Sequence, residues 1–171
     1  MDSLPADELV VKKGVLLANK NYKIPMDYDV DFDVDAENSL LIMLESMKRE
    51  GLQVEIGRKA TSYEEEKNYI VSENNDKYDR PNEFNSDLRT GSSVEIYSKN
   101  TDPRLESDFL ETEAGKWLLD NSYKYGFVLR YPEGKEAVTG FIANGHIYKF
   151  VGTENAEKIH QASVTVDEYF K

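Results

Sequence analysis

The chain has 171 residues, with 21 Lys and Arg against 33 Asp and Glu, which gives a formal net charge of −12. This charge argues against a nucleic-acid partner, because binding to phosphates needs clustered cationic side chains. The chain has no Cys and only two His, which excludes disulfides, thiolate zinc sites and a zinc site with three His ligands from one chain.

The apolar stretches of the chain are short. The longest, residues 40–44, falls far below the roughly 20 residues needed to cross a bilayer. Met1 is not followed by a charged and then apolar signal sequence. We therefore expect no membrane span and no export signal in the chain as given, and a domain cut from a longer exported protein stays an open alternative.

Residues 1–34 are expected to hold one strand and an extended segment. The strand is predicted at Val10 to Asn19. After it, Asp alternates with apolar residues up to Asp35, which fits either a half-buried strand or an extended wrap over the core. The Asp repeat suggests calcium, but an EF-hand loop starting at Asp31 would need Gly where the chain has Ala36. A solvated segment is favoured, and the role of residues 27–37 stays open.

The next elements are predicted from helix caps and apolar spacing. Asp35 is a plausible N-cap for an amphipathic helix that ends at Gly51. Residues 52–56 alternate as a strand does, and residues 61–65 provide a cap for a second helix that continues to Val71. Residues 73–90 form the longest irregular segment and lead to a strand around residues 94–96.

The second half of the chain alternates between helices and strands. Helices are expected across residues 104–121, followed by a strand at residues 127–130. Two more strands, residues 138–142 and 147–151, are predicted as a hairpin joined by Asn144 and Gly145, with a closing helix at residues 154–161. We expect one α+β domain over residues 1–171, with residues 35–171 as the core and a mostly antiparallel sheet flanked by helices.

Several segments of the chain resemble the zinc D-alanyl-D-alanine carboxypeptidases of the VanY type. The resemblance is carried by residues 117–135, by Thr139-Gly140 and by residues 148–152, with further matches at residues 15–20, 62–65 and 166–170. It implies the D,D-carboxypeptidase (VanY/Hedgehog-like) fold. Family members are exported bacterial cell-wall enzymes that remove the terminal D-alanine of peptidoglycan stem peptides. They use a zinc ion held by His, Asp and His, with a Glu as general base.

The chain departs from this family at its chemical positions. The motif Ser-x-His-x-x-Gly-x-x-x-Asp matches residues 86–95, but Leu88 takes the His position and Glu95 the Asp position. In the second motif, Glu-Pro-Trp-His, Asn144 takes the base position and Ile147 the second His. Neither Leu nor Ile can bind zinc, and an amide cannot act as the base. The resemblance therefore implies a divergent member that lacks the metal ligands and the catalytic base.

Two further positions bear on the family pattern. Thr61 stands where the family has an Arg that holds the substrate carboxylate, although Arg58 and Lys59 could partly replace its charge. His146 could act as a shifted ligand, but neighbouring strand residues point to opposite faces, so this would need a one-residue bulge. The residues expected to line the former site and meet a ligand, besides Glu95 and Asn144, are Thr61, Ser62, Tyr63, Ser86 and Tyr148.

We expect a catalytically inactive, zinc-free relative that serves as a binding or scaffolding module outside a bacterial cell. Its partner would be a peptidoglycan stem peptide or a cell-surface protein. One alternative is an active metallopeptidase with a remodelled site, in which Glu95, Asp87 and His146 surround a different cation. Another is a purely structural domain whose former groove is filled by Leu88 and Ile147 packed against each other.

Overall fold

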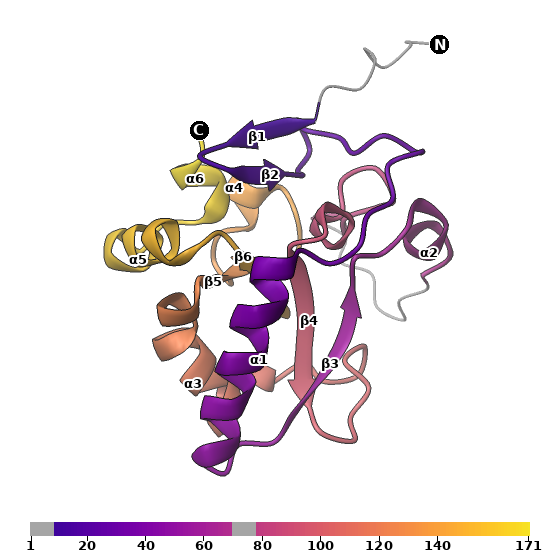
Figure 1. Ribbon diagram of the computed structural model, residues 1–171. Coiled ribbons are helices and arrows are strands. Elements are labelled where there is room, and N and C mark those ends of the chain that lie inside the picture. Colours follow the sequence, from indigo (N-terminus) through magenta and orange to yellow (C-terminus); the bar gives the residue numbers. More distant parts are fainter. Residues whose placement is uncertain (1–8, 70–77) are drawn as a thin grey trace, which may run out of the picture.

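A computed structural model describes residues 9–69 and 78–171 of the chain (Figure 1). Within them, a two-stranded hairpin and a separate four-stranded sheet are formed, and every strand pair is antiparallel. The four-stranded sheet has the order β3-β4-β6-β5. The strands are β1 (Val10–Lys12), β2 (Val15–Leu17), β3 (Val54–Lys59), β4 (Ser93–Ser98), β5 (Phe127–Tyr131) and β6 (Asn144–Phe150).

Helices flank the sheet, which confirms the expected α+β fold with an antiparallel sheet. The α-helices are α1 (Val34–Arg49), α2 (Tyr63–Asn68), α3 (Glu113–Asn121), α4 (Glu136–Thr139), α5 (Thr153–Ala162) and α6 (Val166–Tyr169). Short 3-10 turns are η1 (Asp87–Thr90), η2 (Phe109–Glu111) and η3 (Ser122–Tyr125). None of the helices in the described residues is long and apolar enough to cross a membrane.

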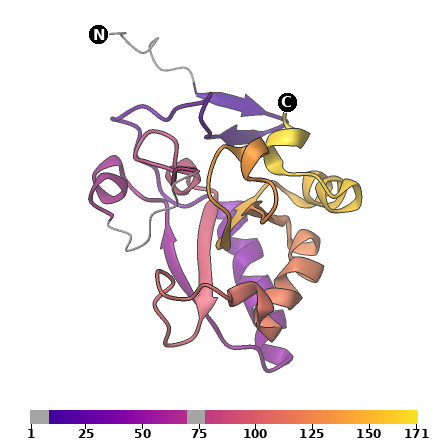
Figure 2. The same cartoon turned by 180° about the vertical axis from the view of Figure 1, so that it is seen from behind.

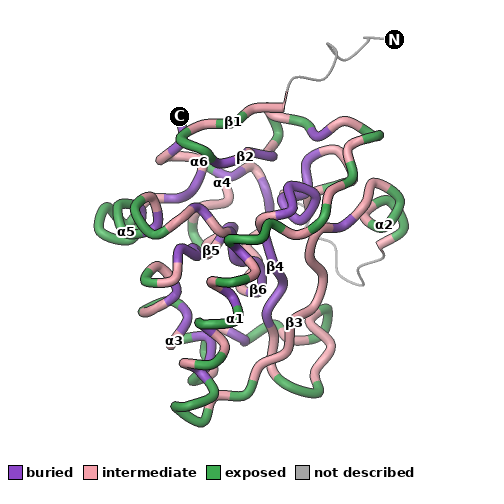
Figure 3. Tube along the Cα trace, in the orientation of Figure 1, coloured by how far each residue is buried: buried purple, intermediate pink, exposed green. Residues whose placement is uncertain are grey.

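The main core lies between the sheet and the helices α1 and α3 (Figures 1 and 2). Buried side chains of α1, among them Leu40 and Met43, pack with Val94 and Ile96 of β4 and with Leu118 of α3. Figure 3 shows buried positions following β4 and the inner side of α1. A second cluster joins the β1–β2 hairpin with α5 and α6. The two clusters occupy different regions of one α+β fold.

The start of α1 lies two residues before the predicted one. Asp33, rather than Asp35, is the N-cap, and its carboxylate accepts a hydrogen bond of 2.9 Å from the backbone N–H of Ala36. Asp35 lies in the first turn, where a negative charge favours the positive end of the helix dipole. The predicted end is close, since α1 stops before Gly51, which adopts a φ of +79°.

Residues 18–33 form an extended segment without strand pairing. Of the two alternatives for this segment, the extended wrap over the core is therefore confirmed, and the half-buried strand is wrong. Arg89 fixes the wrap to η1. Its guanidinium is fully buried and donates hydrogen bonds to the carbonyl oxygens of Ile24, Pro25 and Tyr28, at 3.1, 2.7 and 2.6 Å. A buried guanidinium needs such acceptors, because unpaired buried donors are costly. Burial also lowers the pKa of Arg89.

Two predicted strands are corrected by the structure. The strand expected at Val10 to Asn19 is the β1–β2 hairpin, because Lys13 and Gly14 adopt φ values of +49° and +77° and reverse the chain. The strand expected at residues 138–142 is absent. The chain forms α4 instead, since the backbone N–H groups of Val138 and Thr139 each bind the carbonyl oxygen of Lys135 at 2.9 Å.

The hairpin expected at Asn144 and Gly145 is wrong. Both residues lie within β6, and with α4 in place of a preceding strand there is no second strand for a turn to join. Other bounds shift by a few residues: β3 starts later than predicted, and Thr112 separates η2 from α3 in the region expected to be helical. Helix α6 was not predicted. Helix α2 ends at Asn68, with Tyr69 as an extended C-cap, so it is shorter than predicted, and the expected end at Val71 lies outside the described residues.

Candidate functional site

A groove of about 540 Å³ lies over the sheet, between β4, β6 and the segment of residues 103–111. Of the positions predicted from the sequence, its lining includes Ser86, Leu88, Glu95, Asn144 and Ile147. The groove therefore occupies the place that the sequence motifs predicted for the former catalytic site.

The register of the sheet brings these positions together. Glu95 of β4 is the direct partner of Ile147 of β6, so both side chains leave the same face of the sheet. Tyr131 of β5 is the partner of Asn144. The turn η1 precedes β4 and ends at Gly91, which has a φ of +76°. This turn places Leu88 over the same face.

The two positions that align with His in the family motifs lie in apolar surroundings. Leu88 and Ile147 are 1% and 5% exposed and form one buried cluster with Tyr131 and Phe141. The expectation that Leu88 and Ile147 pack together is confirmed. The expectation that they fill the groove is wrong, because the groove remains open beside them. The cluster forms part of the floor of the groove.

Zinc does not fit the residues that hold these positions. The four positions of the motifs hold Leu88, Glu95, Asn144 and Ile147. Leu88 and Ile147 have no metal-binding atom, and the amide oxygen of Asn144 accepts a hydrogen bond of 2.8 Å from the backbone N–H of His146. Glu95 alone keeps a carboxylate. Throughout residues 9–69 and 78–171, no three His, Cys, Asp or Glu side chains are grouped so that they could hold a metal ion. A zinc ion needs three or four such ligands.

Glu95 is paired with Arg58 of β3. Its Oε2 accepts a hydrogen bond of 3.2 Å from the guanidinium of Arg58, and its Oε1 accepts one of 3.3 Å from the backbone N–H of the same residue. The other end of the guanidinium donates to Glu66 of α2 at 3.1 Å. The ring of Tyr69 lies against the guanidinium, and the ring centre is 3.4 Å from the Cζ atom of Arg58. Both carboxylates are nearly buried, with side chains 4% and 6% exposed.

His146 points away from Glu95. Its ring stacks on Phe109 of the main core, with centroids 5.0 Å apart, and its two nitrogens lie 2.9 and 2.8 Å from the carbonyl oxygens of Ile96 and Glu106. Ile147, the next residue, belongs to the cluster on the other face. The strand has the ordinary alternation at this point, so His146 does not replace the ligand at position 147.

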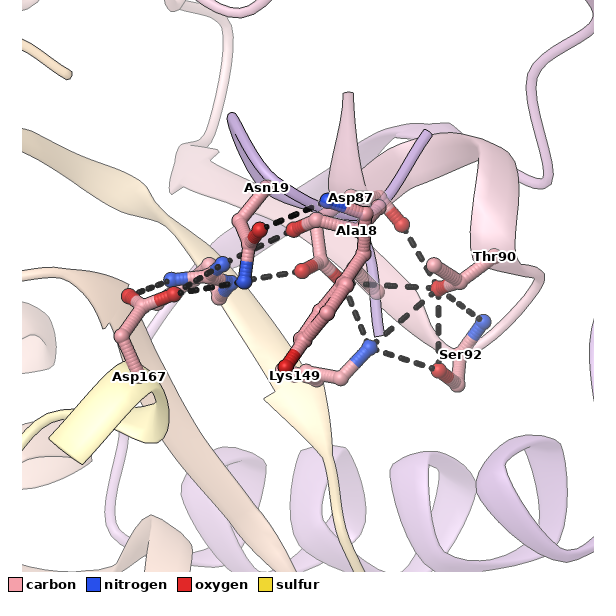
Figure 4. Close-up of polar contacts among 10 residues, drawn as sticks. Ala18, Asn19, Asp87, Thr90, Ser92, Lys149 and Asp167 are labelled. Atoms are coloured by element: carbon pink, nitrogen blue, oxygen red, sulfur yellow. Dashed lines mark hydrogen bonds and ion pairs between the residues drawn. The ribbon is translucent and has the colours of Figure 1, made fainter. Parts of the chain in front are cut away.

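Asp87, which lies in the sequence between the groove residues Ser86 and Leu88, belongs to a network of buried charges (Figure 4). Its carboxylate accepts hydrogen bonds of 2.5 Å from Lys149 and from Arg130, and both partners are fully buried. Burial alone would raise the pKa of Asp87, but Lys149 and Arg130 outweigh burial and lower the pKa to about 2. Arg130 also binds Asp167 and the carbonyl oxygen of Ala18. With its carboxylate held by these two cations, Asp87 is not placed to join Glu95 around a metal ion.

The other predicted contact residues do not line the described groove. Thr61 is buried, and its N–H binds the carbonyl oxygen of Leu88 at 3.1 Å. Ser62 caps α2 in a capping box with Glu65, and Tyr63 packs edge-on against Phe84.

Tyr148 is the clearest departure from the predicted contact residues. Its side chain is fully buried in the main core, on the face of β6 opposite to Ile147. Burial raises the pKa of its phenol. Strand alternation separates Tyr148 from the groove, because successive side chains of β6 point to opposite faces.

The expectation that Arg58 or Lys59 could replace the charge of the lost Arg is not supported by their contacts. Arg58 is held by Glu66 and Glu95, and Lys59 donates a hydrogen bond of 2.6 Å to Glu37 of α1. Both side chains are engaged within the protein.

The sequence reasoning missed the partners of two buried charges. Arg130 and Lys149 each stand alone in an apolar strand, within the sequences Phe-Val-Leu-Arg-Tyr and Ile-Tyr-Lys-Phe. A single charge in such a run signals a buried pair, because an unpaired charge would be too costly there. The pairing of Arg58 with Glu95 carries no such signal in the sequence, since the partners lie 37 residues apart on different strands.

Comparisons with known proteins match this chain to carboxypeptidases. The family model described as VanY, D-alanyl-D-alanine carboxypeptidase, matches residues 30–153. The putative carboxypeptidase YodJ of Bacillus subtilis (strain 168) is 30% identical over an alignment of 182 positions, which covers 91% of this chain and 66% of YodJ. The chain thus spans just under two thirds of that relative.

Solved structures of carboxypeptidases have the same fold. The LD-carboxypeptidase LdcB, whose structure addresses peptidoglycan recognition, superimposes with a TM-score of 0.76 at 25% identity, covering 99% of this chain and 97% of that chain. The L,D-carboxypeptidase DacB of Streptococcus pneumoniae gives a TM-score of 0.76 at 28% identity, covering 91% of this chain and 85% of that chain.

Proposed function

The chain belongs to the VanY family of D-alanyl-D-alanine carboxypeptidases, and from this premise we propose that it is a catalytically inactive member that acts as a binding or scaffolding module. Its retained groove would bind a peptidoglycan stem peptide or a segment of a cell-surface protein. Its place would be outside a bacterial cell, at the cell wall, as for the enzymes that it resembles.

One observation carries the proposal. The positions that hold zinc in the family are occupied by an apolar pair, Leu88 and Ile147, and by Glu95, whose carboxylate is already paired with Arg58. Family chemistry needs a metal-bound water and a base to take its proton. Asn144, at the base position, is an amide and cannot take a proton at neutral pH.

The groove also lacks the means to hold a peptide carboxylate firmly. Such a group is normally bound by an Arg fork or a metal ion. Thr61 stands at the Arg position, and Arg58 is engaged with Glu66 and Glu95. We expect binding of single D-Ala-D-Ala peptides to be weak.

Metal content and D-alanine release test the loss of activity. The purified protein is incubated with excess zinc, passed through gel filtration and measured by elemental analysis, and then assayed on a pentapeptide ending in D-Ala-D-Ala and on the corresponding tetrapeptide. DacB, an L,D-carboxypeptidase, serves as the positive control for the tetrapeptide. We expect no stoichiometric zinc and no D-alanine. One zinc per chain with release of D-alanine would contradict the proposal and favour the metallopeptidase alternative.

Sedimentation with purified peptidoglycan tests the binding role. Glu133 lines the groove, whereas Glu157 lies on the exposed side of α5, so Glu133→Arg and Glu157→Arg change the charge equally at different places. We expect the unmodified protein and Glu157→Arg to sediment with peptidoglycan and Glu133→Arg to remain in solution. Equal sedimentation of the two variants would show that the groove is not the binding surface.

A further inference from the structure

Arg58 binds two nearly buried carboxylates at once. The two ends of its guanidinium lie 3.1 Å from an oxygen of Glu66 and 3.2 Å from an oxygen of Glu95, and its own backbone N–H donates to Glu95 as well. The Arg58 side chain is 25% exposed, and its guanidinium rests on the ring of Tyr69. Three contacts therefore hold the guanidinium in the groove, and a fourth holds the backbone of Arg58 to Glu95.

A local irregularity of the sheet makes these contacts possible. The pairing of β3 with β4 shifts register between Ile56 and Lys59, as at a β-bulge. Bulges re-aim side chains at functional sites. Here the shift brings both the backbone N–H and the guanidinium of Arg58 to the carboxylate of Glu95.

Gly57 leaves room for this arrangement. A Cβ atom at this position would overlap Oε1 of Glu95 and would lie 2.8 Å from the ring of Tyr97. A side chain at position 57 would therefore displace the carboxylate that Arg58 holds. Both the glycine at this point of β3 and the register shift beside it allow the contact between Arg58 and Glu95.

A buried carboxylate requires a cation or several hydrogen-bond donors. At the position of Glu95, the family supplies a metal ion. In this chain the donors come from Arg58, and the remaining neighbours of that position, Leu88 and Ile147, offer none. The guanidinium thus provides the positive charge that the carboxylates need.

We propose that Arg58 is the built-in cation of this site, which holds Glu66 and Glu95 in place of a metal ion and closes the site to divalent cations. This inference rests on the proposed function, because it assumes that the unmodified chain does not use zinc. In this proposal two changes explain why the site does not bind a metal ion. The His ligands are missing, and Arg58 is paired with the remaining carboxylate, Glu95.

Restoring the His ligands with and without Arg58 tests the inference. Leu88→His combined with Ile147→His returns the missing imidazoles, and Arg58→Ala then frees Glu95. Arg104→Ala is the matched control, because Arg104 also lines the groove but is paired with Asp102 instead of Glu95. Zinc affinity is measured by competition with a chromogenic chelator, and folding by circular dichroism.

We expect Arg58→Ala to raise the zinc affinity of the restored double variant by about tenfold or more, since partners of metal ligands typically change affinity by 10- to 100-fold. Arg104→Ala should leave the affinity of the double variant unchanged, and Arg58→Lys, which keeps the charge, should not raise it. Equal zinc affinities with and without Arg58 would overturn the inference.

A second measurement needs no His substitution. In the otherwise unmodified chain, Arg58→Ala leaves Glu66 and Glu95 without their shared cation. Because hard cations bind carboxylate oxygens, 5 to 10 mM calcium chloride, roughly the range suited to weak sites, should raise the melting temperature of Arg58→Ala and leave the unmodified protein and Arg104→Ala unchanged. No calcium response of a folded Arg58→Ala protein would contradict the inference.

The two proposals fail in different ways. Stoichiometric zinc on the unmodified protein, with release of D-alanine, contradicts the proposed function. Equal zinc affinities of the restored chains, together with a zinc-free unmodified protein, contradict only the role of Arg58.

Discussion

Lys149 donates a hydrogen bond of 2.5 Å to Oδ1 of Asp87, and neither side chain is exposed to solvent. Arg130 binds the other carboxylate oxygen of Asp87. Two buried cations thus depend on one buried anion, with Asp167 as a second partner of Arg130. Removing the shared anion should be much more costly than removing an exposed charge.

Asp87→Asn tests this dependence. The substitution leaves Lys149 and Arg130 without their common anion, and we expect a loss of about 3–5 kcal/mol in the free energy of unfolding. Urea denaturation at neutral pH measures the loss. Asp102→Asn is the control, because Asp102 lies in an exposed pair with Arg104 and should change the stability little. A small effect of Asp87→Asn would contradict the importance of the network.

The same network predicts how stability changes with pH. The pKa of Asp87 is about 2 in the folded state and about 3.9 in an unfolded chain. A carboxyl group with a lowered folded pKa stabilises the fold above its unfolded pKa, and this contribution is lost as the pH falls through the folded value. We therefore expect Asp87 to contribute about 2 kcal/mol above pH 4 that disappears towards pH 2. Asp87→Asn should lose stability less steeply in this window in denaturation curves.

Leu88→Ala should destabilise the protein by about 2–5 kcal/mol, because it opens a cavity in a well-packed cluster. Ile147→Ala should act similarly, and since both residues belong to one cluster, their effects should not add in a double-mutant cycle. Leu105→Ala is the control, since Leu105 lines the groove but is 74% exposed. Additive losses measured by urea denaturation would show that Leu88 and Ile147 do not share a cavity.

Gly57→Ala should disturb the groove without a large change in the core. The added methyl group would overlap the carboxylate of Glu95, which is held by Arg58. We expect a loss of about 1–3 kcal/mol, as for other overpacked positions. Gly134→Ala controls for the loss of a glycine at a position with no neighbour within 4 Å, although its φ of +80° adds backbone strain. Thermal denaturation with nuclear magnetic resonance of the Arg58 side-chain NH signals measures both effects.

His146→Leu should loosen the segment of residues 103–108. The ring nitrogens of His146 face the carbonyl oxygens of Ile96 and Glu106, and leucine would leave both acceptors without this partner. We expect a loss of about 1–3 kcal/mol and faster amide hydrogen exchange around Glu106. His160 lies in α5, where its ring stacks on Tyr123, so His160→Leu should leave the exchange around Glu106 unchanged. Equal exchange rates in the two variants would show that His146 does not hold this segment.

Much of the fold followed from local signals. Helix α1 and strands β4 and β5 were predicted because caps, spacing and alternation agree in these segments. The hairpin at Asn144 and Gly145 failed because a turn dipeptide specifies a hairpin only when a strand stands on each side, and α4 replaces one of them. The strand at residues 138–142 was predicted from apolar residues such as Val138, but Val138 is 44% exposed and does not belong to the core.

The candidate site was predictable only where sequence motifs fix the register. Leu88, Glu95, Asn144 and Ile147 do meet at the groove, as the motifs required. Tyr148 does not, although the alternation of β6 already placed it opposite to Ile147. The contact of Arg58 with Glu95 depends on a register shift in β3, which no local pattern specifies.

Arg130 has consequences for how the chain folds during synthesis. Its partners Ala18, Asp87 and Asp167 are separated from it by 112, 43 and 37 residues, so one side chain joins early, middle and late parts of the sequence. Contacts between distant residues form slowly, and a growing chain offers them in order from its N-terminus. The ribosome delivers Arg130 well before Asp167. Until α6 has emerged, Arg130 lacks one of its carboxylates, and Asp87 is the one carboxylate partner that the nascent protein can offer it.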